Sequence, residues 1–173
     1  MTATRWLDEQ EQAAWQSFLE ATHRVERRLE RQLREDAGLS HPQYEVLVRL
    51  AREPEGAMRM TELARALITS KSGLTYQIGQ LEKRGLVSRS SCPEDVRGVR
   101  AQLTDEGRQV LKDTAPGHVE AVRVALIDPL TREELTTVAE ALGRIGERLR
   151  EPGTPERGGK NGHRAPHAGT ERG

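Results

Sequence analysis

TELARALITSKSGLTYQIGQLEKRGLVSRSSCPEDVRGVRAQLT, residues 61–104, contains the pattern that decides the fold. Apolar residues recur at helical spacing in residues 61–67 and 71–84, which predicts two short helices separated by three residues. Residues 86–90 and 99–103 alternate in polarity around a segment with Pro and Gly, which predicts a two-stranded hairpin. Two such helices followed by a hairpin are typical of a winged helix-turn-helix unit.

The ends of these helices have recognisable capping residues. Thr61 is a plausible N-cap for the first short helix, and Ser70 for the second. Gly85 directly follows the second helix, where a residue that tolerates left-handed backbone is favoured.

Further helices flank this unit on both sides. Residues 9–36 predict a long helix that ends before Gly38, and Ser40-His41-Pro42-Gln43 predicts a capping box that opens a helix extending to about Arg52. Thr104 and Thr131 predict the starts of two more helices. The apolar stripes of the first and last of these helices are Trp15, Phe18, Leu19, Thr22, Val25, Leu29 and Leu33, and Leu135, Val138, Ala139, Leu142, Ile145 and Leu149.

The predicted fold is therefore mainly α: a winged helix-turn-helix with N- and C-terminal dimerisation helices and a two-stranded β wing. We expect the N-terminal dimerisation helix in residues 1–36, the DNA-binding lobe in 37–104 and the C-terminal dimerisation helices in 105–151. Residues 152–173 are rich in Gly and Pro and lack Leu, Ile, Val and Phe, so we expect a disordered tail.

The formal charge is zero, from 27 Lys and Arg against 27 Asp and Glu, but it is unevenly distributed along the chain. Residues 59–100 have 8 basic and 4 acidic groups, a net charge of +4, whereas residues 1–58 and 101–151 each carry −3. The basic island coincides with the predicted helix-turn-helix and wing. This distribution keeps nucleic acid among the possible partners, although the total charge does not suggest it.

The second short helix has the chemistry that a DNA-contacting helix needs. Its outward positions carry a cation for phosphates and small polar side chains that can bond base edges in the major groove. The same polar face is also compatible with an ordinary solvated helix, because helix-turn-helix geometry also serves as a packing unit. The candidate DNA-contacting residues outside the wing are Thr61, Ser70, Lys71, Ser72, Thr75, Tyr76 and Gln77.

The hairpin strengthens the DNA interpretation. Its turn carries Asp95 and Arg97, and an Arg at a wing tip can enter a minor groove, oriented by a neighbouring carboxylate. Arg89 and Arg100, on the strands, could add phosphate contacts. The alternative is a surface Asp–Arg pair that contributes little to stability.

The run LTYQIGQLEKRGLVSRSSCPEDVRGVRAQLTDEGRQVL resembles the recognition helix and wing of the MarR-type transcriptional regulators. Its most specific pieces are LEKRGLV, the Asp95-x-Arg97 motif and LTDEGR, and the resemblance extends over roughly residues 10–150. It implies a homodimer that binds a pseudo-palindromic operator in double-stranded DNA, usually as a repressor, with Arg97 as the minor-groove contact and Asp95 as its partner. The family often has Arg or Lys near Gln77, so its base preference is not transferable.

The flanking helices predict the dimer from their apolar faces as well, because a small lobe cannot cover two long amphipathic helices. Packing within one chain is the alternative. Family members bind small, often phenolic, anions between the lobe and the dimer helices. The candidate effector-contacting residues are Trp15, His23, Tyr44 and Arg49, each of which could equally be a packing or surface residue.

Other chemistries have little support in the sequence. The single Cys92 excludes an internal disulfide and has no resolving partner, and no His, Cys or acidic cluster has ligand spacing. No catalytic arrangement is evident, so we expect neither an enzyme nor a cofactor. No apolar run is long enough for a membrane and no signal-peptide pattern is present, so we expect a cytoplasmic protein. A winged-helix module that docks a protein partner without binding DNA is the alternative function.

Overall fold

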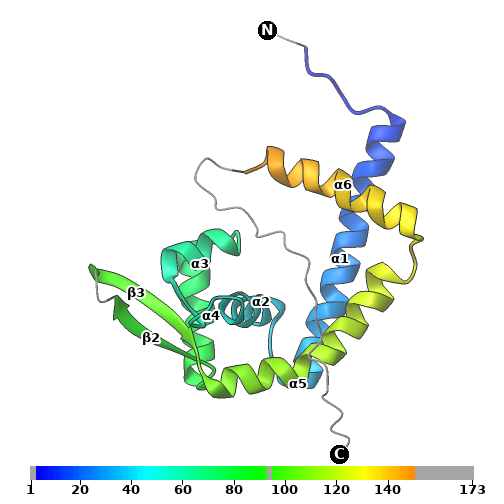
Figure 1. Ribbon diagram of the computed structural model, residues 1–173. Coiled ribbons are helices and arrows are strands. Elements are labelled where there is room, and N and C mark those ends of the chain that lie inside the picture. The colour runs from blue at the N-terminus through cyan, green and yellow to red at the C-terminus, as the bar shows by residue number, and fades with distance from the viewer. Residues whose placement is uncertain (1–2, 93–94, 151–173) are drawn as a thin grey trace, which may run out of the picture.

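The computed structural model describes residues 3–92 and 95–150, and for residues 92 and 95–97 it describes the backbone alone. The chain forms a lobe and a stem (Figure 1). The elements of the lobe are α2 (His41–Ala51), β1 (Ala57–Arg59), α3 (Met60–Ala66), α4 (Lys71–Lys83), β2 (Val87–Cys92) and β3 (Asp95–Leu103). The elements of the stem are α1 (Glu9–Ala37), α5 (Asp105–Val122), the π-helical turn η1 (Arg123–Ile127) and α6 (Arg132–Arg148). The predicted tail, residues 152–173, lies outside the described residues.

Local capping explains where most helices begin. Ser40, Ser70, Thr104 and Thr131 each accept a hydrogen bond from the backbone N–H three residues further on, as the sequence predicted. Gly38, with φ of 61°, ends α1 in the left-handed conformation. The prediction for Thr61 is wrong: α3 begins at Met60, so Thr61 lies inside the helix, and the N-cap residue Arg59 makes no side-chain capping bond.

The sheet has three antiparallel strands in the order β1-β3-β2, so the predicted two-stranded wing is incomplete. The added strand, β1, pairs Met58 with Ala101 of β3. Its three residues directly precede α3, so the base of the wing is joined to the start of the helix-turn-helix. A strand this short has no usable alternation of its own, and its existence depends on pairing with a segment more than 40 residues away.

The hydrophobic core lies inside the lobe. Helices α2, α3 and α4 surround it, the strands close it, and α1 contributes Leu33 from the stem. The fully buried large side chains are Leu33, Leu39, Val46, Leu47, Leu50, Leu63, Leu74, Ile78, Leu81 and Val87. The predicted stripe of α4 is thus confirmed, and the opposite face of this helix is left free.

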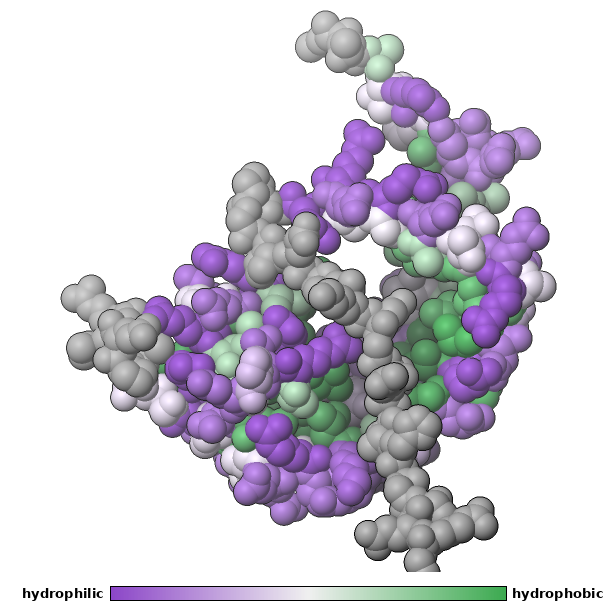
Figure 2. All heavy atoms as spheres, in the orientation of Figure 1, coloured by the Kyte–Doolittle hydropathy of each residue, from purple (hydrophilic) through white to green (hydrophobic). Residues whose placement is uncertain are grey.

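The stem is much less covered by its own chain. Only Leu29 and Leu33 of the apolar stripe of α1 are buried, whereas Trp15 and Phe18 are exposed. Helix α6 has no buried residue at all. Figure 2 shows hydrophobic side chains open to view on the stem between α6 and α5.

Candidate nucleic-acid interface

Helix α4 presents a polar face because its apolar stripe is turned inward. Lys71, Ser72, Thr75 and Tyr76 are all exposed, and 63% of Tyr76 is accessible. The Ser70 hydroxyl accepts a hydrogen bond from Gly73 N (3.0 Å), so it is occupied as the cap of the helix. The predicted DNA-contacting residues at the start of α4 therefore lie together on one accessible surface.

Three hydroxyls of this surface make local hydrogen bonds. Thr75 Oγ1 donates to the Lys71 carbonyl oxygen (2.8 Å), and the Ser70 and Ser72 hydroxyls lie 3.2 Å apart. Each hydroxyl oxygen keeps a lone pair, so it can still accept a bond from a base amino group or a water. Thr61, one residue inside α3, is also exposed.

Gln77 differs from its expected position. It is half-buried, and its Oε1 atom is inaccessible and has no hydrogen-bond partner among the described residues. Gln77 follows Leu74 by three residues, which places the two on the same side of a helix. The prediction that Gln77 points outward is therefore wrong.

The strand arginines of the wing are paired within the chain. Arg89 binds Glu82 of α4 through two nitrogens, at 2.5 and 3.0 Å, and Arg100 lies 3.2 Å from Glu55. The bond from Arg89 lowers the pKa of the Glu82 carboxyl below its ordinary value. An exposed pair of this kind contributes little to stability, so the guanidinium group of Arg89 can turn toward a phosphate. Arg100 is only partly exposed, and its Nε atom is inaccessible and has no hydrogen-bond partner among the described residues.

The wing tip is described only in part. The predicted hairpin is present, but its strands are longer than predicted. Strand β3 begins at Asp95 and includes Arg97, so the prediction that these two residues lie in the turn is wrong. The side chains of Asp95, Arg97 and Cys92, on which the predicted minor-groove contact and the question of a redox-sensitive thiol depend, lie outside the described residues.

The four candidate effector residues do not form one site. Trp15 stacks on Phe18 near the exposed end of α1, with ring centroids 6.2 Å apart. Tyr44 is buried under the ring of His118, and Arg49 pairs with Glu53 at 2.9 Å.

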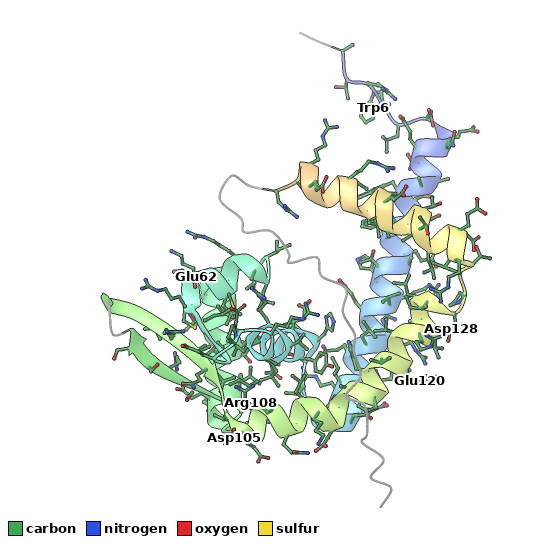
Figure 3. The ribbon with its side chains drawn as sticks, in the orientation of Figure 1. Trp6, Glu62, Asp105, Arg108, Glu120 and Asp128 are labelled. Carbon is green, nitrogen blue, oxygen red and sulfur yellow. The ribbon has the colours of Figure 1, made fainter. Side chains whose placement is uncertain are left out.

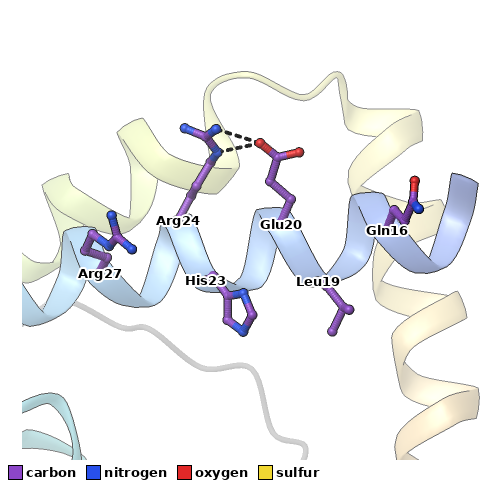
Figure 4. Close-up of a pocket in the computed structure, with 6 residues that line it drawn as sticks. All are labelled: Gln16, Leu19, Glu20, His23, Arg24 and Arg27. Atoms are coloured by element: carbon purple, nitrogen blue, oxygen red, sulfur yellow. Dashed lines mark hydrogen bonds and ion pairs between the residues drawn. The ribbon is translucent and has the colours of Figure 1, made fainter.

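His23 lines two open clefts on α1. Figure 4 shows it on α1, where a dashed line marks the pairing of Arg24 with Glu20. A second cleft extends from there to α2, and both contain His23 and Arg27. The residues that line the two clefts are Gln16, Leu19, Glu20, His23, Arg24 and Arg27, and His23, Glu26, Arg27, Glu30, His41, Pro42 and Glu45.

A polar contact between stem and lobe was not predicted from the sequence. The ring of His118 from α5 lies 4.4 Å from that of Tyr44 in α2, and its Nδ1 atom lies 3.2 Å from Gln32 Oε1 in α1. Burial, and secondarily the charge of His41, lowers the pKa of His118. No sequence pattern indicated this contact, because its members are far apart in the chain.

Figure 3 shows charged side chains on several elements of the lobe and the stem. Glu62 lies on α3, Asp105 and Arg108 lie at the start of α5, Glu120 lies near the end of α5, and Asp128 follows η1. Within residues 3–92 and 95–150, no group of three or more His, Cys, Asp or Glu side chains could hold a metal ion. Across the same residues, no helix is both long and apolar enough to cross a membrane.

The chain has the features of a winged helix-turn-helix protein: a helix-turn-helix, a three-stranded wing and an exposed polar face on α4. The model of the MarR family matches residues 39–99. The structure of Sco3205, a MarR family transcriptional regulator from Streptomyces coelicolor solved in complex with DNA, is 45% identical, with a TM-score of 0.84 over 88% of this chain and 95% of that one. The chain belongs to the MarR family of transcriptional regulators.

Two curated relatives agree with this assignment. The HTH-type transcriptional regulator PecS of Dickeya dadantii (strain 3937) is 32% identical over 112 residues, 64% of this chain and 67% of the relative. The HTH-type transcriptional repressor YetL of Bacillus subtilis (strain 168) is 31% identical over 112 residues, 65% of this chain and 66% of the relative. The chain thus spans about two thirds of each of them. All three proteins are transcriptional regulators, in agreement with the resemblance seen in the sequence.

Proposed function

We propose that the protein is a homodimeric repressor that binds a pseudo-palindromic operator in double-stranded DNA and is released by a small effector. The observation that carries the proposal is the exposed polar face at the start of α4, where Lys71, Ser72, Thr75 and Tyr76 lie together. A recognition helix contacts base edges through its N-terminal residues. Lys71 has no ion-pair partner among the described residues, so its charge is available to a phosphate.

The wing extends this surface in the proposal. Arg97 enters the minor groove beside the recognition helix, with Asp95 as its orienting partner. On binding, Arg89 exchanges Glu82 for a DNA phosphate, and Arg100 exchanges Glu55 for another. Binding of the wing to DNA therefore requires two ion pairs within the chain to break. Affinity should therefore fall steeply as salt rises, since bound counterions are released from the DNA.

The second subunit is inferred from the uncovered stem. Leu142 and Ile145 of α6 and the C-cap residue Leu149 are 45–75% exposed. Trp15 and Phe18 form an exposed aromatic pair on α1. A monomer rarely leaves so many large apolar side chains in water, and a twofold arrangement covers both helices with the same surface. It also sets two α4 helices at half-sites about one turn of DNA apart.

We propose repression because the relative YetL is a transcriptional repressor, and an effector because of the clefts on α1. Arg27 lines both clefts and has no ion-pair partner in the described part of the chain. An unpaired guanidinium favours a small anion such as a phenolate or a carboxylate. His23 lies in the same clefts, whereas Trp15, Tyr44 and Arg49 do not line them.

The direct test measures binding to duplex DNA from upstream of the coding region, by fluorescence anisotropy at several salt concentrations. We expect tight binding that weakens as salt rises, and Lys71→Ala should weaken binding to all sequences and reduce the salt slope by about 1. Lys112→Ala removes the same charge from α5 and should have no effect, which makes it the matched control. Arg97→Ala should weaken operator binding without dissociating the dimer.

The alternative function, a module that docks a protein partner, makes the opposite prediction for DNA. Negligible affinity for duplex DNA even at low salt would reject the DNA-binding proposal. Sedimentation equilibrium of the Ile145→Asp variant tests the dimer separately, because a charge in an apolar interface should dissociate it. A variant that stays dimeric would place the interface elsewhere.

A further inference from the structure

The turn between α3 and α4 contains an unexpected residue. Ile68 has φ of +52°, the only positive φ at a non-glycine position in the described residues. The left-handed region is unfavourable for side chains branched at Cβ, so Ile is a poor choice there and Gly a good one. The turn requires this backbone: Ile68 N donates to the Arg65 carbonyl oxygen (3.2 Å) and Thr69 N to that of Ala64 (3.1 Å), which closes α3 before α4 begins.

The side chain of Ile68 does not contribute to the core. It is 78% exposed, whereas Leu63 and Leu74, in the helices on either side, are fully buried. The fold therefore accepts both a strained backbone and an exposed alkyl group at this position. Neither the turn nor the packing of the core explains an isoleucine, which leaves a role in what this surface binds.

The surroundings of Ile68 favour a polyanion. Arg65 precedes it by three residues and Lys71 follows it by three, and both side chains are exposed and have no ion-pair partner within the described part of the chain. Ser72, a proposed base contact, lies one residue beyond Lys71 and is also exposed. Figure 1 places this turn at the edge of the lobe, away from α5. The alkyl group thus lies on the proposed DNA-binding surface, between two unpaired cations.

We propose that Ile68 is an apolar specificity residue that packs against the 5-methyl group of a thymine in the major groove of each half-site. This inference rests on the proposed function. The thymine methyl is the one alkyl group that the bases present in the major groove, and apolar side chains recognise it by contact. Contact between the Ile68 side chain and the thymine methyl group displaces water from both surfaces. This contact favours thymine at that position, a preference that the polar residues of α4 do not supply.

The test combines protein and DNA changes in one cycle. Operator DNA is prepared with deoxyuridine in place of each half-site thymine in turn, which removes only the methyl group, and is measured with wild type and with Ile68→Gly. At one thymine per half-site, wild type should lose about fourfold in affinity for each methyl removed, the effect of burying one such group. The Ile68→Gly variant should bind the unmodified operator as weakly as wild type binds the deoxyuridine-substituted operator. Its affinity should not fall further when that thymine is replaced by deoxyuridine.

Controls separate this contact from a folding defect. Ile68→Gly should unfold at the same temperature as wild type or higher, because glycine relieves the strained turn. Ile68→Val, which keeps a branched alkyl group, should retain most of the preference for thymine. Deoxyuridine outside the half-sites should have no effect.

Two results would overturn the inference while leaving the proposed function intact. One is operator binding by Ile68→Gly that is as tight as wild type, and the other is an equal loss on deoxyuridine DNA for both proteins. Wild type that binds no duplex DNA would instead reject the proposed function, and the inference with it. The comparison of thymine with deoxyuridine also tests the alternative that Ile68 contacts an acidic protein partner. In that case, removing the thymine methyl group would not change DNA affinity.

Discussion

Gly107 in the first turn of α5 allows that helix to pack against the base of the wing. A Cβ atom at this position would overlap the backbone carbonyl oxygen of Leu86 and lie 2.7 Å from Cδ1 of Leu103. Thr104 fixes the same turn from the other side, accepting from Gly107 N (3.0 Å) and donating to the Gly85 carbonyl oxygen (2.7 Å). Because the obstacle is backbone, a small side-chain movement cannot make room.

Gly107→Ala should therefore destabilise the fold although alanine is the better helix former. Overpacking of this kind costs about 3 kcal/mol, and the gain in helix propensity returns about 1 kcal/mol. The net expectation is a free energy of unfolding lower by about 2 kcal/mol, with a melting temperature lower by about 4–8 °C for a chain of this size. Urea unfolding followed by far-UV circular dichroism, at one fixed protein concentration, measures it.

The matched control is Gly79→Ala in the middle of α4. A Cβ atom there meets nothing within 4 Å, so the same substitution should raise the free energy of unfolding by about 0.5–1 kcal/mol. The two variants are expected to change stability in opposite directions. If Gly107→Ala were as stable as wild type, the close packing of α5 on the wing would be wrong.

Three further changes test the core of the lobe and its contacts with the stem. Burial lowers the pKa of His118, so the unfolded chain binds a proton at this residue more readily than the folded chain does. The free energy of unfolding should therefore fall as the pH drops below about 6.5. The His118→Gln variant should show a smaller decline, measured by urea unfolding at several pH values. Arg84 donates to the carbonyl oxygens of Ala37 (2.8 Å) and Gly38 (3.0 Å), so Arg84→Ala should lower the free energy of unfolding by about 1 kcal/mol, and Arg84→Lys should restore only part of it. Leu47→Ala should cost about 2–5 kcal/mol in the same assay, as expected for a fully buried leucine.

Helix ends could be predicted from the sequence because capping is local. A serine or threonine cap and the backbone N–H that it accepts from lie three residues apart, so Ser70 and Thr131 could be assigned without knowing the fold. Thr61 failed under the same rule. The N-cap of α3 is Arg59, two residues before Thr61, because strand β1 leads directly into the helix, and this strand exists only through its pairing with β3.

The partners of the wing arginines could not be predicted, because they depend on tertiary distances. Arg100 pairs with Glu55, which is 45 residues away, and Tyr44 is covered by His118 from another helix. The periodicity of the sequence also predicts that α1 has an apolar face, but it does not predict which part of the protein covers that face. Leu33, near the C-terminal end of α1, is buried against the lobe, whereas Trp15 in the same helix is exposed.

Helix α5 offers a physical route between the proposed effector clefts and the proposed DNA surface. Its first turn is fixed to the wing base by close packing at Gly107. Its second half approaches α1 closely at Gly117, where a Cβ atom would lie 2.5 Å from Asp36 Oδ2, and His118 next to it contacts Gln32. One helix thus touches both the wing and α1 without a loop between the two contacts, and Pro116 lies inside the helix between them. A change in the packing of α1 against α5 can therefore be passed to the wing through a single helix. An effector bound on α1 then needs only to favour one such packing to change operator affinity, and it need not touch any DNA-contacting residue.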